Sequence, residues 1–177
     1  MEFTKSFIRV YNISPEEAED FEYENIVQSE ELGFGRGELS MLVADEDHGN
    51  LAWGVQDAED CEYEYSAKNE TIHFALDTKW EPPIEWVVAA SNKVSHFKNK
   101  VITMATIQKD ETCVTGVVVK DGEVLQNKNI FTMEPEEVAK YYEEEDGYDL
   151  DQLDNQIWDS IGSFLTVCEK FYLGGEE

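Results

Sequence analysis

The acidic side chains of this chain are gathered in two flanks, and a segment without net charge separates them. Residues 71–130 contain seven acidic and seven basic side chains. Residues 1–70 contain 19 acidic and 4 basic side chains, and residues 131–177 contain 14 acidic and 2 basic side chains. The formal charge of the 177-residue chain is −27, and the two flanks account for all of it. We therefore expect a single domain over 1–177, with a charge-neutral α+β core at 71–130 and acidic flanks.

This uneven charge favours an interaction surface over adaptation to salt. A salt-adapted protein is expected to spread its acids evenly and to avoid lysine, yet 11 of the 13 basic residues are lysine. Direct binding of nucleic acid or of an anionic membrane is disfavoured, because both would repel a chain with a pI near 4.2. The partner class that remains is a basic protein.

The apolar content is sufficient for a folded core, since 41% of the residues are hydrophobic and 12% are aromatic. No apolar run approaches the roughly 20 residues that cross a bilayer, and the first residues lack the pattern of a secretory leader. Three widely separated cysteines, Cys61, Cys113 and Cys168, form no Cys-x-x-Cys motif. Neither a disulfide framework nor a zinc site is indicated, and we expect a cytoplasmic protein.

The N-terminal flank predicts a strand over residues 3–11 and a helix from Ser14 to about Gln28. Ser14 can cap this helix, Pro15 suits its first turn, and Glu17 can complete a capping box. Only Ala18, Phe21 and Ile26 are suited to packing, so the exposed face must be almost wholly anionic. Residues 33–37 predict a loop without a phosphate-loop ending, 38–44 a strand, and 45–50 a solvated turn whose spacing does not fit calcium.

The middle of the chain predicts strands and one helix. Acidic residues alternate with cysteine or tyrosine over residues 60–65. On a strand, this pattern places Asp60, Glu62 and Glu64 on one face and Cys61, Tyr63 and Tyr65 on the other. The other predicted elements are a strand at 71–78, a helix from Pro82-Pro83 to Val94 with Ile84, Val87, Val88 and Ser91 inward, a hairpin of 101–107 with 113–119, a short strand after the Asp121-Gly122 turn, and a helix from Glu134-Pro135 to Tyr142.

Apolar residues at steps of three or four from Leu150 to Tyr172 predict a long final helix that Gly174 ends, preceded by a linker at 143–149. Its apolar stripe can pack on its own sheet or pair with a second copy, so the chain is a monomer or a homodimer. We favour packing on its own sheet.

Residues 53–125 contain Trp53-Gly54 and the segment Thr78-Lys-Trp80-Glu-Pro-Pro83, followed by Thr115-Gly116 and Asp121-Gly122. In these features the chain resembles the YubB/Api92-like ferredoxin-fold family of phages and mobile elements, which more often has Ala-Trp-Ser at this junction. The resemblance implies a ferredoxin-like antiparallel sheet and a mobile-element or viral setting, and it supplies no catalytic residues. We expect an α+β fold with helices packed on one face and with acidic N-terminal and C-terminal extensions. Trp80 is expected to pack over the sheet, while the prolines fix the entry into the helix.

Catalytic chemistry is not indicated. His48, His73 and His96 form no ligand pair, and no Gly-x-Ser-x-Gly elbow is present. Acid pairs are so abundant that two neighbouring carboxylates carry no information about acid–base catalysis. We expect no enzymatic activity, no cofactor and no bound metal, although an acidic metal-dependent hydrolase stays open as an alternative.

The charge itself suggests a function. Duplex DNA carries one negative charge per roughly 1.7 Å, and carboxylates on alternate strand positions or on neighbouring helix turns have comparable spacings. We hypothesise a phage or mobile-element inhibitor that mimics nucleic acid and occupies the DNA- or RNA-binding channel of a host defence complex, of the anti-CRISPR or anti-restriction type. The predicted partner-binding residues are Glu16, Glu17, Glu19, Asp20, Glu22, Glu24, Asp57, Glu59, Asp60, Glu62, Glu64, Glu143, Glu144, Glu145, Asp146, Asp149, Asp151 and Asp154.

The alternative is an acidic binding or immunity protein that acts on a basic protein partner without mimicry. Five tyrosines close to the acidic rows either add specificity for a partner or pack in the ordinary way: Tyr63, Tyr65, Tyr141, Tyr142 and Tyr148.

Overall fold

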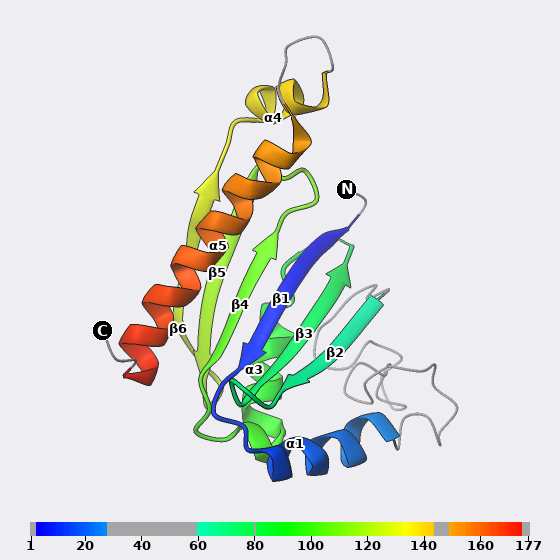
Figure 1. Ribbon diagram of the computed structural model, residues 1–177, viewed down its shortest axis with the longest axis vertical. Helices are drawn as coiled ribbons and strands as arrows, with labels where there is room; N and C mark the ends of the chain where they lie inside the picture. Colours follow the sequence, from blue (N-terminus) through cyan, green and yellow to red (C-terminus); the bar gives the residue numbers. More distant parts are fainter. Residues whose placement is uncertain (1–2, 28–59, 80, 144–148, 175–177) are drawn as a thin grey trace.

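A computed structural model describes residues 3–27, 60–79, 81–143 and 149–174. In this part of the chain six strands form one antiparallel sheet, with helices on both of its faces (Figure 1). The α+β class is therefore confirmed. In spatial order the strands are β2 (Asp60–Ser66), β3 (Thr71–Thr78), β1 (Thr4–Val10), β4 (Ile102–Ile107), β5 (Cys113–Lys120) and β6 (Glu123–Thr132). The helices are α1 (Pro15–Glu22), η1 (Tyr23–Val27), α3 (Ile84–Lys93), η4 (Ser95–Phe97), α4 (Pro135–Tyr142) and α5 (Leu150–Leu173).

One face of the sheet is covered by α1 and α3. Alternate residues of the central strands point to this face, among them Ile8 of β1 and Phe74 of β3, and both are buried. Phe21 of α1 stacks on Phe97 at 5.1 Å between ring centroids, and Trp86 of α3 meets the Phe74 ring edge-on. Phe21 also meets the Phe74 ring of β3 at 6.0 Å between centroids, so aromatic contacts join both helices to the sheet.

The inward face of α3 differs from the predicted one. Val87 and Ser91 are buried as expected, but Trp86 and Ala90 are the other fully buried positions. The remaining predicted positions, Ile84 and Val88, are only partly buried. The helix is thus rotated by about one position, because burying the large Trp86 ring removes more apolar surface from water than burying Ile84 would.

The opposite face of the sheet is covered by α5, so the expectation that the helices pack on one face is wrong. Ile157 and Ile161 of α5 pack with Val114 of β5, and Phe164 packs with Val118. Strands β4 and β5 are buried over nearly their whole length on both faces, and a sheet with two apolar faces needs a cover on each. The favoured packing of the long helix on its own sheet is confirmed.

The described parts of the two acidic flanks are not extensions. Strand β1 lies between β3 and β4 and is an internal strand of the sheet. Its residues Ile8 and Val10 are almost inaccessible to water, which explains why an acidic N-terminal flank contributes a central strand. Helix α5, from the other flank, covers β4, β5 and β6. The strand after Asp121-Gly122, expected to be short, is the ten-residue β6.

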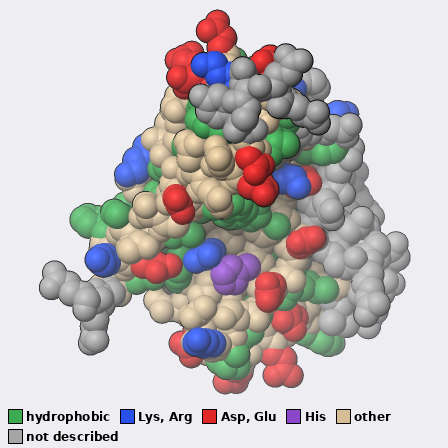
Figure 2. Space-filling model, turned by 45° about the horizontal axis from the view of Figure 1, so that its top comes forward, with side chains coloured by type: hydrophobic (Ala, Val, Ile, Leu, Met, Phe, Trp, Pro, Cys, Tyr) green, Lys and Arg blue, Asp and Glu red, His purple; other side chains and the backbone are tan. Residues whose placement is uncertain are grey.

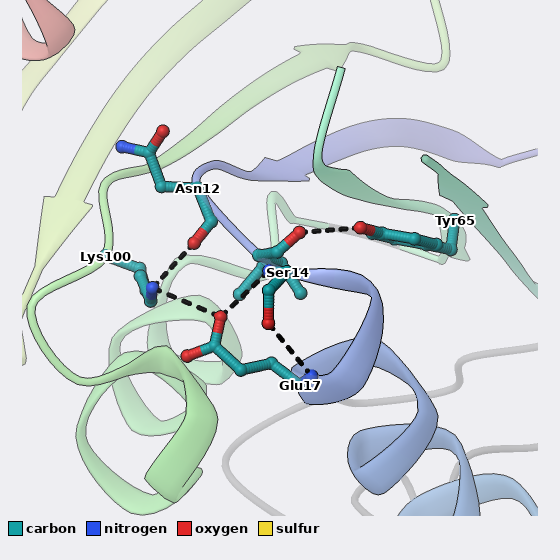
Figure 3. A network of polar contacts seen from close by, with 6 residues as sticks. Asn12, Ser14, Glu17, Tyr65 and Lys100 are labelled. Atoms are coloured by element: carbon teal, nitrogen blue, oxygen red, sulfur yellow. Dashed lines mark hydrogen bonds and ion pairs between the residues drawn. The ribbon is translucent and has the colours of Figure 1, made fainter. Parts of the chain in front are cut away.

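The start of α1 is fixed by the predicted capping box (Figure 3). The Glu17 N–H donates to Ser14 Oγ at 3.2 Å, and the Ser14 N–H donates to Glu17 Oε2 at 2.9 Å. Lys100 Nζ lies 3.4 Å from the same Glu17 oxygen and donates to the Asn12 carbonyl at 2.6 Å. The Tyr65 hydroxyl donates to the Ile13 carbonyl at 2.7 Å, so β2 holds this turn as well.

Helix α5 ends at the predicted signal, Gly174, and its start is capped by Asp149, which was predicted to lie in the linker. The Asp149 carboxylate accepts the Asp151 N–H at 3.1 Å at its start, and Gly174 adopts a left-handed φ of 62° directly after its end. Several predictions fall outside the described residues, among them the strand at 38–44, the loops at 33–37 and 45–50, the face of the Cys61 side chain, the packing of Trp80, and most of the linker at 143–149.

Candidate partner-binding surfaces

The predicted partner-binding residues that the structure describes fall into three groups. The α1 surface comprises Glu16, Glu19 and Asp20; the β2 surface comprises Glu62 and Glu64; and the α4–α5 tip comprises Glu143, Asp149, Asp151 and Asp154, to which the structure adds the unpredicted Glu136 and Glu137. All of these side chains are exposed. Asp57, Glu59, Glu144, Glu145 and Asp146 lie outside the described residues, and for Asp60 the structure describes only the backbone, which pairs with Asp77.

Half of the acidic residues predicted on α1 contact the protein itself. Besides Glu17, the Glu22 carboxylate accepts the Tyr63 hydroxyl at 3.0 Å, and Glu24 lies 3.5 Å from His96. The hydrogen bond from the Ser14 N–H, with the nearby Lys100 ammonium, lowers the pKa of Glu17. Burial and the Glu22 contact raise the pKa of Tyr63. The exposed carboxylates of the α1 surface therefore lie on a segment whose other acidic side chains attach it to the rest of the protein.

The alternation predicted for β2 is confirmed where its side chains are described. Glu62 and Glu64 are exposed, whereas Tyr63 and Tyr65 are half-buried and pack against the core under α1 and α3. In the sheet register, Glu64 lies opposite His73 of β3, and His73 in turn lies opposite Arg9 of β1. The exposed face of β2 therefore continues across β3 and β1.

Basic groups interrupt the acidic row on this face. Arg9 Nη1 lies 3.7 Å from Glu169 Oε1 of α5, and Lys5 lies 4.0 Å from Asp77. Partial burial and the adjacent Arg9 guanidinium lower the pKa of His73. Figure 2 shows acidic, basic and histidine side chains next to one another on one face of the molecule. The β2 surface is thus the edge of a mixed-charge face.

Helix α5 borders this mixed-charge face and contacts strand β1 there. The Trp158 ring lies 4.9 Å from the Phe7 ring of β1, and the Tyr11 hydroxyl lies 3.3 Å from both Thr103 Oγ1 and Glu169 Oε1. Burial, above all, raises the pKa of Tyr11. None of these residues was predicted from the sequence as part of a site. Because alternate residues of a strand point to the same face, the sequence of β1 could have indicated that Phe7 and Arg9 share a face. Nothing in the sequence indicated that α5 would lie next to them.

The α4–α5 tip has the largest net negative charge of the three surfaces in its immediate sequence, since residues 134–159 contain eleven acidic residues and one basic residue, Lys140. The tip is also firmly attached. The Tyr142 hydroxyl donates to Glu111 Oε1 at 2.7 Å, and this bond raises the pKa of Tyr142 to about 12. Gln156 of α5 donates to the Tyr141 hydroxyl at 3.0 Å. Buried Glu111, in the turn between β4 and β5, was not singled out from the sequence.

The three surfaces do not merge into one row within the described residues. Helix α4 and the start of α5 lie at one end of the long axis of the molecule, and α1 lies at the other end (Figure 1). The described residues contain 26 acidic and 12 basic side chains, a difference of −14. The acidic surfaces that the structure describes are therefore distributed along the molecule and are separated by the mixed-charge face.

The described residues offer little for catalysis or metal binding. Among them, no three His, Cys, Asp or Glu side chains gather closely enough to hold a metal ion. Burial raises the pKa of the Cys168 thiol, which disfavours the reactive thiolate. None of the described helices is long and apolar enough to cross a membrane.

Comparisons of the chain with protein-family models, with curated proteins and with solved structures find no match. The resemblance to the YubB/Api92-like family therefore stays a prediction.

Proposed function

We propose that this protein is a nucleic-acid mimic that occupies the basic DNA- or RNA-binding channel of a host defence complex, of the anti-CRISPR or anti-restriction type. It would bind a basic protein as its partner and would bind neither nucleic acid nor membrane. We propose no catalytic role and no cofactor. The observation that carries the proposal is the amount of negative charge per unit length.

The negative charge per unit length of the described residues is within a factor of two of that of a duplex. Helix α5 has 24 residues, which makes it about 36 Å long, and it runs along most of the long axis in Figure 1. Over the length of α5, the net charge of −14 that the described residues carry amounts to one negative charge per about 2.6 Å. Duplex DNA carries one per about 1.7 Å.

The attachment of the acidic residues supports the proposal. Like charges at this density repel and destabilise the folded state, so carboxylates can be held close together only on elements that other contacts fix. The α1 surface is held by the capping box with Lys100, and the α4–α5 tip is held by Tyr142 and Tyr141. We rank these two surfaces above the β2 surface, because Lys5, Arg9 and His73 accompany the latter.

The mixed-charge face favours the second candidate function, which is binding of a basic protein without mimicry. Specific protein interfaces combine both signs of charge with exposed aromatic residues. The alternation of Glu64, His73 and Arg9 beside the Phe7–Trp158 pair has this character. A duplex has no cations in its backbone, so a partner bound through this face would not be recognising a copy of nucleic acid.

We also propose a ferredoxin-like assignment for the first four strands. Their chain order with α1 and α3 is β-α-β-β-α-β, and their spatial order is β2-β3-β1-β4 with antiparallel neighbours, which is the pattern of the split βαβ motif. Strands β5 and β6 and helices α4 and α5 would then be additions to that core. A phage or mobile-element origin and a site of action in the host cytoplasm rest on the family resemblance and remain part of the proposal.

The test is capture of a partner from lysate followed by release with nucleic acid. The immobilised protein should retain a basic nucleic-acid-binding protein or complex, and duplex DNA or RNA should release it, whereas an uncharged polymer should not. Affinity should fall as salt rises, since the Debye length shrinks from about 8 Å at physiological ionic strength to about 3 Å at 1 M. A partner that competing nucleic acid does not release would favour binding without mimicry.

Charge-reversal pairs identify the surface used. Each of three variants carries two Lys substitutions: Glu19 with Asp20, Glu62 with Glu64, and Glu143 with Asp154. The control, Glu81→Lys with Glu85→Lys, changes two exposed residues near α3 and gives the same net charge of −23. A pair at the contact surface should weaken binding much more than the control does. Equal loss in all four variants would show that only the total charge matters and would contradict docking of a defined surface.

A further inference from the structure

A groove runs between α5 and the edge strand β6, away from the acidic surfaces. It has a volume of about 500 Å³, its floor contains Phe164 and Ile130, and the small residues Ser160 and Ser163 form its helix side. Within the described residues, β6 is the outermost strand on this side and pairs only with β5. One side of the sheet therefore ends in an open depression next to a long helix.

Exposed apolar side chains surround this groove. Val167 of α5 is 59% exposed and lines it, and Phe171, one helical turn further, is 78% exposed. On β6, Leu125 is also exposed, whereas exposed Val124 pairs with Val119 and lies on the α3 face of the sheet. Gln126 lies within 4.0 Å of Cys168, which places this end of the strand beside the last turns of α5. Several large apolar residues thus remain in water along one edge, as is typical of an interaction site.

Within the described residues, this edge carries no net charge, in a strongly acidic protein. Strand β6 contains Glu123 and Lys128, and the half of α5 beside it contains Asp159 and Lys170 on the exposed positions near the groove. A basic partner would gain no charge complementarity here, because the acidic surfaces lie elsewhere. A second copy of the chain, which every acidic surface repels, can approach most closely at a neutral edge.

We propose that the α5–β6 groove is the interface of a symmetric homodimer. Leu125 and Ile130 of β6 have no partner on β5 and form bulges in the strand. Bulges disfavour the addition of a strand from a second copy to this edge. We therefore expect the two copies to touch through side chains of α5 and not through a sheet that continues from one copy into the other. Two antiparallel α5 helices around a two-fold axis near Val167 bring each Phe171 ring to the level of Ser163 of the partner subunit, over the groove. Each copy then covers the apolar residues of the other.

The test is sedimentation equilibrium of the full chain at several concentrations and ionic strengths. Screening of the repulsion between two chains of −27 should tighten the dimer, by more than about tenfold between about 0.05 and 0.5 M salt. This sign is opposite to that expected for a complex with a basic partner, so failure of this inference and failure of the proposed function are distinguishable.

Two variants with equal charge locate the interface. Phe171→Asp adds one negative charge at the groove, and Leu150→Asp adds one at an exposed position at the other end of the same helix. Phe171→Asp should weaken dimerisation by at least about tenfold relative to Leu150→Asp, while the circular dichroism spectra of both stay those of the parent. A protein that is monomeric at every salt concentration, a dimer that weakens with salt, or equal effects of the two variants would overturn the proposal.

Discussion

Adding one methyl group at Gly116 tests how α5 lies on the sheet. Gly116 is in the middle of β5, directly under α5. A Cβ atom at this position would lie 2.8 and 2.9 Å from two carbon atoms of the Phe164 ring and 3.0 Å from Ile130 Cγ2. The absence of a side chain at Gly116 is therefore what lets the Phe164 ring rest on the strand.

The expected cost of Gly116→Ala follows from these distances. Carbon atoms prefer separations of about 3.5–4.0 Å, so the ring has to move by roughly 0.6–1 Å. Phe164 is 5% exposed and closely surrounded, and overpacking of this kind costs about 1–3 kcal/mol. For a chain of this size, each kcal/mol corresponds to a change of about 2–4 °C in Tm.

Gly162→Ala is the matched control, because it adds the same methyl group on the exposed side of α5, where a Cβ would meet no atom within 4 Å. Both changes restrict the unfolded chain to a similar extent, so the difference between them reports on the folded state. Gly162→Ala should stabilise the protein by about 0.5–1 kcal/mol.

The free energy of unfolding of both variants is measured by urea unfolding at one fixed salt concentration. Tryptophan fluorescence, to which buried Trp86 contributes as one of four tryptophans, reports the transition. If Gly116→Ala were as stable as Gly162→Ala, α5 would not lie against β5 as described.

Three further predictions concern polar contacts. Ser14→Ala should cost about 1 kcal/mol in urea unfolding, because it removes the α1 cap; an unchanged midpoint would contradict that role. The lowered pKa of Glu17 means that its contribution is present above the ordinary pKa of 4.5 and is lost as pH falls through the lower folded value; Glu17→Gln should therefore flatten the acid side of the stability profile, and a parallel profile would refute this. The raised pKa of Tyr142, about 12, means that its contribution is complete below pH 10 and is lost as pH rises toward 12; in Glu111→Gln one tyrosine should titrate closer to 10 by ultraviolet absorbance, and an unchanged titration curve would exclude the Glu111 bond as the cause.

Local patterns in the sequence were sufficient for the elements whose signals are local. The steps of three and four predicted α5, the Ser14–Glu17 spacing predicted the capping box, and the alternation in β2 predicted the faces of Glu62 and Tyr63. In each case the residues that interact, or that share a face, lie within a few positions of one another. Such patterns fix secondary structure and orientation within an element.

The arrangement of elements in space was not predictable in the same way. The apolar stripe of α5 requires an apolar surface but does not say which face of the sheet provides it, so helices on both faces were not foreseen. The pairing of Arg9 with Glu169 joins residues 160 positions apart and leaves no trace in local spacing. For the same reason nothing in the local pattern of Asp60, Glu62 and Glu64 indicated that β1, which is separated from β2 by β3, brings Lys5 and Arg9 to the same face.

The central claim is that negative charge held along this protein substitutes for the phosphates of a nucleic acid. The most direct measurement is a competition titration, in which the fluorescence anisotropy of the labelled protein bound to its purified partner is followed as duplex DNA or RNA is added. Mimicry predicts full displacement, with the midpoint set by the partner's own affinity for that nucleic acid, and the same exclusion when the order of addition is reversed. A stable ternary complex at saturating nucleic acid would contradict the claim.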